Sequence, residues 1–110
     1  MSMDSKQAVA VLGALAQETR LAVFRHLVTA GEAGAGAGAI AASLDVPSPT
    51  LSFHLKELER AGIIISRRES RQIYYSASYT RVKALINFLT EDCCRGHLDV
   101  RAATKRRRAS

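Results

Sequence analysis

The sequence lacks any hydrophobic run long enough to cross a membrane, because no stretch approaches the roughly 20 apolar residues that a spanning helix needs. The first residues, MSMDSKQAVAV, lack the charged start and the cleavage site of a secretory signal. We therefore expect a cytoplasmic protein with no membrane partner. The 110 residues, 47% hydrophobic and 24% charged, are typical of one globular domain. A chain of this size often shares apolar surface with a second copy, so a homodimer is expected.

Cysteine is scarce, and the two cysteines of the chain are adjacent, at Cys93 and Cys94. A disulfide is not expected to persist in the cytosol, so these are thiols available for another role. One alternative is a thiol enzyme, which would need an activating base beside the cysteine and a substrate pocket. No Cys-His-acid arrangement is visible, and we therefore expect a protein that is not an enzyme and uses no catalytic cofactor.

Positive charge is in excess, with 16 Lys and Arg against 10 Asp and Glu, for a net charge of +6. This balance suits a polyanionic partner such as nucleic acid, although charge alone is weak evidence. Much of the excess lies near the end of the chain, which we expect to be a solvated, disordered tail. A nonspecific phosphate contact is the alternative for its five cations, Arg101, Lys105, Arg106, Arg107 and Arg108.

Apolar periodicity predicts four helices in the first part of the chain, over residues 4–15, 17–28, 37–44 and 48–61. Glycines at positions 31, 34, 36 and 38 predict a flexible loop between the second and third helices. A three-residue turn, Asp45 to Pro47, separates the third helix from the fourth. Ser48 is the expected N-cap of the fourth helix, with Pro49 in its first turn.

The fourth helix has two different faces. Leu51, Leu55 and Leu58 repeat at the spacing of a buried face. The other side carries mostly short hydrogen-bonding or basic side chains, namely Thr50, Ser52, Phe53, His54, Lys56 and Glu57. A helix, a tight turn and a second helix with such an outer face are a helix-turn-helix pattern.

A hairpin and a last helix follow. Residues 63–68 and 72–76 read as two strands joined by 69–71, and a helix from about Ser78 carries an apolar stripe that could close the core or the dimer. The expected fold is mainly α (α+β), a winged helix-turn-helix of order α-α-α-α-β-β-α over residues 1–92, with residues 93–110 as a separate cysteine-pair and basic segment. Three cations gather on the hairpin, Arg67, Arg68 and Arg71.

Two strings carry a family resemblance, LGALAQETRLAVFRHL and VPSPTLSFHLKELERAGIIISRRESRQIYYSAS. Their element Ser-x-x-x-Ser-x-His-Leu-x-x-Leu, from Ser48 to Leu58, is followed at once by Ala-Gly and Arg-Arg. The sequence thus resembles the ArsR (ArsR/SmtB) family of winged-helix repressors over about residues 4–92. Ser70 departs from the pattern, since many members carry Gly at that wing turn. The resemblance implies a homodimer built from the first and last helices, repressing its own operon until a metal or metalloid binds.

The resemblance also guides the expected contacts with an inverted-repeat operator. Recognition helices about 34 to 36 Å apart would enter successive major grooves. Base contacts are expected from Ser48, Thr50, Ser52 and His54, with Phe53 on the same surface. Phosphate contacts are expected from Lys56, Arg67, Arg68 and Arg71.

The inducer site differs between members of the family. The stretch from Gly34 to Leu44 has no cysteine pair, and the stretch from Thr80 to Glu91 has no histidine for a zinc site. Some members carry vicinal cysteines at the end of the last helix for trivalent arsenic, as Cys93 and Cys94 stand here. The resemblance therefore implies an arsenic-resistance type repressor that responds to arsenite or an organic arsenical such as methylarsenite, and antimonite would fit the same pair.

Several alternatives for this cysteine pair stay open. A third ligand could come from His97 or from the other subunit, because residues 97–103 contain no further cysteine. The repressor could instead sense another soft metal or thiol oxidation. Adjacent cysteines form only a strained ring when bridged, which makes an intramolecular disulfide a poor switch.

Overall fold

The structure is a computed structural model that describes residues 2–91. The mainly α winged helix-turn-helix fold is confirmed, with two short elements added between the second and third helices. The described elements are α1 (Ser5–Leu15), α2 (Glu18–Ala30), the 3-10 helix η1 (Gly31–Ala33), β1 (Ala35–Gly36), α3 (Ala37–Leu44), α4 (Ser48–Arg60), β2 (Ile64–Glu69), β3 (Gln72–Ala77) and α5 (Tyr79–Thr90).

Side chains that precede the first two helices fix where each begins. Asp4 and Gln7 form a capping box, in which the Gln7 N–H donates to Asp4 Oδ1 at 2.8 Å and the Asp4 N–H donates to Gln7 Oε1 at 2.9 Å. Gln17 Oε1 accepts from the Arg20 N–H at 2.8 Å. Helix α4 is different, because its N-cap is Pro47 and no side chain caps it. The predicted capping role of Ser48 is therefore wrong, and Ser48 is the first residue of the helix.

The glycine-rich stretch is not the predicted flexible loop. It forms η1 and β1, and β1 pairs antiparallel with β3 through Ala35 and Tyr75 to make a sheet of order β1-β3-β2. Gly34 has φ +73°, and a Cβ at this position would collide with the main-chain oxygen of Tyr75. The stretch is ordered because glycine lets the two backbones approach closely.

Strands β2 and β3 form an antiparallel hairpin, called the wing below, whose register runs from Ile64 opposite Ala77 to Glu69 opposite Gln72. The connecting turn places Ser70 at φ +58°, in the left-handed region that favours glycine. This backbone conformation explains physically why glycine suits the position.

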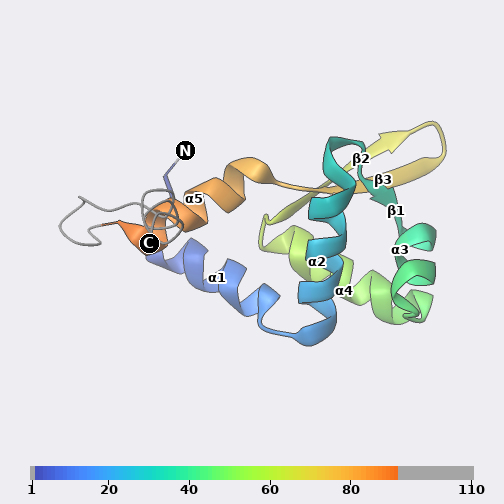
Figure 1. Ribbon diagram of the computed structural model, residues 1–110, viewed down its shortest axis with the longest axis horizontal. Coiled ribbons are helices and arrows are strands. Elements are labelled where there is room, and N and C mark those ends of the chain that lie inside the picture. The colour runs from blue at the N-terminus through green and yellow to red at the C-terminus, as the bar shows by residue number, and fades with distance from the viewer. Residues whose placement is uncertain (1, 92–110) are drawn as a thin grey trace, which may run out of the picture.

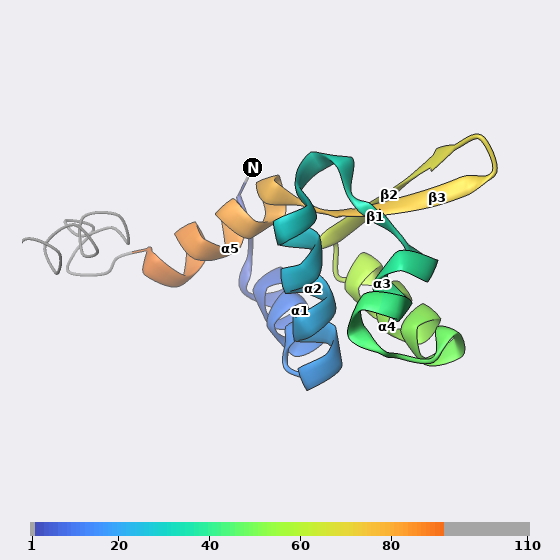
Figure 2. The same cartoon turned by 45° about the vertical axis from the view of Figure 1, so that its right-hand side comes forward.

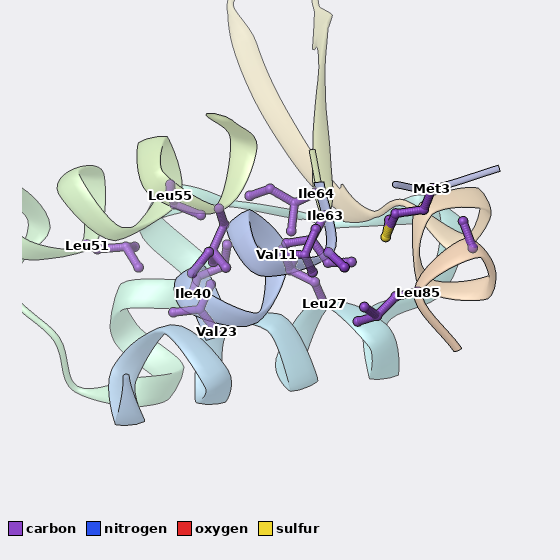
Figure 3. Close-up of a cluster of buried hydrophobic side chains, with 14 residues drawn as sticks. Met3, Val11, Val23, Leu27, Ile40, Leu51, Leu55, Ile63, Ile64 and Leu85 are labelled. Carbon is purple, nitrogen blue, oxygen red and sulfur yellow. The ribbon is translucent and has the colours of Figure 1, made fainter. Parts of the chain in front are cut away.

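One hydrophobic core joins the helices to the base of the wing (Figure 3). It includes fully buried side chains from α1, α2, α3, α4 and β2, among them Val11, Val23, Leu27, Ile40, Leu58 and Ile64. Met3 and Leu85 of α5 belong to one buried cluster, so the segment before α1 is part of the same core. The core holds the two helices of the helix-turn-helix against the rest of the domain.

The elements divide between two ends of the molecule. In Figures 1 and 2, α1 and α5 lie at one end, and α3 and the tip of the wing lie at the other. The start of α5 is attached to the middle of the fold, because the Ser78 N–H donates to the Ile63 carbonyl at 2.9 Å and the Tyr79 hydroxyl donates to the Val28 carbonyl at 3.3 Å.

Candidate nucleic-acid interface

The turn between α3 and α4 sets the direction of the predicted recognition helix. Asp45 ends α3 in the left-handed conformation, with φ +53°, and the Val46 N–H donates to the Ala41 carbonyl at 3.0 Å. The Leu51 N–H donates to the Pro47 carbonyl at 2.9 Å, which starts α4 immediately. The three-residue turn predicted from the sequence is therefore present.

Helix α4 presents most of the predicted base-reading residues to solvent. Leu51, Leu55 and Leu58 are buried on its inner face, as expected from their spacing. The exposed predicted residues of this helix are Ser48, Thr50, Ser52, Phe53 and Lys56. The structure therefore leaves these five side chains open to solvent along α4.

His54 lies elsewhere, although it was predicted to face the bases. Only 7% of this residue is exposed, and its Nδ1 is 3.3 Å from the Arg20 guanidinium. Burial, and next the Arg20 charge, lower the pKa of His54 below its ordinary value of 6.5. In this position the side chain packs on the inner side of the recognition helix, toward α2, and does not reach a base edge.

Arg20 connects three helices, a role that the residue pattern did not predict. Its Nε donates to the Ala14 carbonyl at the end of α1 at 2.6 Å, while its Nη1 donates to His54 on α4. Arg20 and His54 are 34 positions apart, and nothing in the linear pattern pairs them.

The wing arginines divide into two kinds. Arg68 and Arg71 are exposed at and near the hairpin turn, as expected for phosphate contacts. Arg67 instead donates to the carbonyls of Glu32 at 3.2 Å and Ala33 at 2.8 Å, which belong to η1. It also lies 5.3 Å from the centre of the Tyr74 ring. Its guanidinium therefore holds the wing against the connection between α2 and α3.

Another link fixes the base of the wing to α4. The Ser66 hydroxyl donates to Glu59 Oε2 at 2.7 Å. Arg81 of α5 covers the turn after α4, where a Cβ on Gly62 would stand 3.1 Å from the Arg81 Cζ. The end of α4, the wing and the start of α5 therefore meet at one junction.

Apolar side chains are exposed at the opposite end of the molecule, on α1 and α5. Val9 is 68% exposed and Leu89 is 55% exposed, and Leu12 and Ile86 accompany them. Exposed apolar residues on two helices at one end of a small domain are typical of an interface.

The proposed inducer residues Cys93 and Cys94, the alternative ligand His97 and the basic tail lie outside the described residues. Within residues 2–91, no group of three or more His, Cys, Asp or Glu side chains is placed to hold a metal ion. Over the same range, no helix has the length and apolar character needed to cross a membrane.

Comparison with known proteins identifies relatives of this architecture. The Helix-turn-helix domain family matches residues 15–67. The chain is 32% identical over 97 residues to the transcriptional activator HlyU of Vibrio cholerae, covering 88% of this chain and 87% of HlyU. A solved HlyU structure gives a TM-score of 0.65 at 33% identity, covering 86% of this chain and 100% of HlyU, and HlyU has also been solved in a reduced form.

Two further solved structures are similar over most of the chain. An ArsR-like transcriptional regulator from Rhodococcus sp. RHA1 has a TM-score of 0.71 at 26% identity, covering 94% of this chain and 88% of its own. The homodimeric winged helix-turn-helix DNA-binding domain of Mb0332 from Mycobacterium bovis has a TM-score of 0.64 at 27% identity, covering 84% of this chain and 85% of its own. With a winged helix-turn-helix, an outward-facing α4 and relatives that are transcriptional regulators, this chain belongs to the ArsR family of winged-helix transcriptional regulators.

Proposed function

We propose that this protein is a homodimeric repressor of an arsenic-resistance type operon, released from an inverted-repeat operator when trivalent arsenic binds Cys93 and Cys94. The observation that carries the proposal is the position of α5. This helix exposes apolar residues at the far end from the wing, and the two cysteines follow it after Glu91 and Asp92 in the sequence.

The dimer is supported by the exposed apolar side chains of α1 and α5. An apolar side chain that passes from full exposure to full burial contributes about 1.5–3 kcal/mol, and a partly exposed one contributes less. Val9, Leu12, Ile86 and Leu89 supply such a surface on each copy, and the homodimeric Mb0332 domain gives a precedent for the assembly. A twofold dimer would place two copies of α4 toward the two halves of an inverted repeat.

The contacts of α5 support the proposed coupling between the thiols and DNA. A ligand can release DNA only if it binds the free dimer more tightly than the DNA-bound dimer, typically by about 1–3 kcal/mol. The start of α5 contacts the residues that follow α4, through the Ser78–Ile63 hydrogen bond and the approach of Arg81 to Gly62. A displacement of α5 on ligand binding would therefore reach the recognition helix through this connection, whose Gly62 and Ile63 N–H groups donate to carbonyls of α4.

The number of sulfurs bears on which arsenical is the inducer. Inorganic trivalent arsenic prefers three sulfur ligands, whereas a methylated or aryl arsenical already has one carbon bond and needs two. The chain supplies two cysteines. Unless His97, a solvent thiol or a cysteine of the second subunit completes the set, organic trivalent arsenicals would bind at least as well as arsenite. Antimonite, another soft trivalent metalloid ion, would fit the same thiolates.

The test is release from a DNA duplex that the wild-type protein selects from a random pool, followed by fluorescence anisotropy. Arsenite, methylarsenite, antimonite and zinc are titrated separately against the wild type, Cys93→Ser, Cys94→Ser and the double variant. We expect arsenicals to release the wild type and to leave the double variant bound. Release by zinc alone would overturn the arsenic proposal, and a double variant that still responds to arsenicals would place their site elsewhere.

The sign of regulation needs a separate measurement, because the relative HlyU is named an activator. A transcription assay in vitro, with the selected duplex overlapping the promoter, should show that the protein lowers transcript yield and that the inducing arsenical restores it. Higher yield on adding the protein would contradict repression while leaving DNA binding intact.

Thiol oxidation is the second candidate signal, favoured by the existence of a reduced HlyU structure among the relatives. Peroxide would then release DNA at concentrations at which arsenite does not, through sulfenic acid or a disulfide between subunits. Titrating peroxide and arsenite in parallel, with dithiothreitol added afterwards to reverse oxidation, separates the two sensors.

A further inference from the structure

The outermost stripe of α4 has an apolar centre. At about 100° per residue, Pro49, Phe53, Lys56 and Arg60 fall opposite the buried leucines of the same helix. All four are exposed, and Phe53 is 57% exposed, more than any other aromatic residue within 2–91. The ring therefore lies on the face of α4 that is opposite its buried leucines.

The ring is also held from behind. Phe53 and His54 meet edge to face, with their centroids 5.6 Å apart and their planes at 63°. The His54 ring is in turn fixed by the Arg20 hydrogen bond. An exposed aromatic side chain on a supported helix loses little conformational freedom when it binds, so it is suited to a contact surface.

The chemistry of the major groove limits what such a ring can contact. Base edges there present hydrogen-bond donors and acceptors, and their apolar group is the C5-methyl of thymine. Phe53 carries no hydrogen-bonding group, while Ser52 and Lys56 beside it do. An aromatic ring at this position gains binding energy mainly by removing another apolar group from water.

We propose that Phe53 is a specificity-determining residue that reads the methyl group of a thymine in each half of the DNA site. The inference rests on the DNA-binding role of this family and not on the identity of the inducer. The neighbouring polar side chains would fix the register of α4, and Phe53 would select thymine over cytosine at one base pair.

Deoxyuridine is the sharpest probe, because it differs from thymidine only by lacking that methyl group. The wild-type protein first selects a duplex from a random pool, and each thymine of this duplex is then replaced singly by deoxyuridine. We expect one thymine per half-site whose replacement weakens wild-type binding about fourfold, the effect of one methyl group removed from a buried contact. Phe53→Ala should bind the thymine and deoxyuridine duplexes equally.

Lys56→Ala is the matched control on the same stripe. It should weaken binding to every duplex, yet keep the fourfold ratio between thymine and deoxyuridine. Melting of Phe53→Ala followed by circular dichroism checks that this exposed substitution leaves the fold intact. Wild-type protein that tolerates deoxyuridine at every position, or a Phe53→Ala variant that keeps the ratio, would overturn the inference and leave DNA binding standing. If the wild-type protein selected no DNA sequence, the inference about Phe53 and the proposed DNA-binding function would both be overturned.

Discussion

The Arg20 Nη1 lies 3.3 Å from the His54 Nδ1, between the second helix and the recognition helix. A guanidinium has donors and no acceptor, so Nδ1 must accept this hydrogen bond, and the neutral ring carries its proton on Nε2. Burial and the adjacent arginine both favour that neutral form, which lowers the pKa of His54. The recognition helix is therefore held to α2 by a bond that requires an uncharged histidine.

This relationship predicts that acid weakens the fold through His54. Because the pKa of His54 is lower in the folded protein than its ordinary 6.5, the unfolded chain binds that proton more readily. Its contribution to stability is full above about pH 6.5, declines as the pH falls below that value, and stops declining once the folded state also binds the proton. Urea denaturation from about pH 8 to about pH 5 measures the decline.

His54→Asn is the informative variant, since its side-chain oxygen can accept from Arg20 and does not titrate. We expect a smaller loss of stability on acidification than in the wild type. Arg20→Lys should lower stability already at neutral pH, because a lysine cannot reproduce the fork that joins Ala14 and His54. Identical pH profiles for wild type and His54→Asn would contradict the assignment.

Substitution by alanine should change the free energy of unfolding in opposite directions at two glycines of the stretch that was predicted to be a loop. Gly34→Ala should lower the free energy of unfolding by about 2 kcal/mol or more, because φ is +73° and the new Cβ would meet the Tyr75 carbonyl. Gly38 lies within α3, and nothing stands within 4 Å of a Cβ there. Gly38→Ala should raise stability by up to about 1 kcal/mol. Chemical denaturation of both variants measures the change in the free energy of unfolding. Equal changes at the two positions would argue against the β1–β3 pairing.

Alanine substitutions at Arg67 and Arg71 should have different effects, the first on stability and the second on DNA binding. Arg67→Ala should lower the unfolding free energy by about 1 kcal/mol, because it removes hydrogen bonds to two η1 carbonyls. Arg71→Ala should leave stability unchanged, weaken binding to all duplexes and reduce the salt slope by about one. Thermal melts and anisotropy titrations at several salt concentrations test the pair. An unchanged affinity and salt slope in Arg71→Ala would mean that the wing tip does not touch phosphate.

Ile86 and Ile73 are matched positions for testing the subunit interface. Each is 43% exposed, but Ile86 lies on α5 and Ile73 on the wing. Ile86→Glu should produce monomers in light scattering after size exclusion, since a buried unpaired carboxylate is costly. Ile73→Glu should remain dimeric. Dissociation by Ile73→Glu alone would place the interface on the wing.

Much of the candidate DNA-binding surface could be predicted from residue spacing. The leucines at 51, 55 and 58 define the inner face of α4, and their spacing is enough to predict that Ser52, Phe53 and Lys56 are exposed. The prediction for His54 was wrong because a position between two faces of a helix does not tell whether a polar ring points inward. The direction of the ring depends on whether a hydrogen-bond partner lies inside the protein. That partner, Arg20, comes from a distant part of the chain.

The sequence by itself determined the order of the helices, the tight turn and the hairpin, because those depend on local periodicity, proline and glycine. It also determined that the two thiols are adjacent, at positions 93 and 94. Only the tertiary structure decided that Gly34 admits a third strand, that Arg67 binds η1 carbonyls and that His54 supports α4 from within. These outcomes depend on backbone groups and side chains brought together from distant positions, and no local pattern encodes which distant groups will meet.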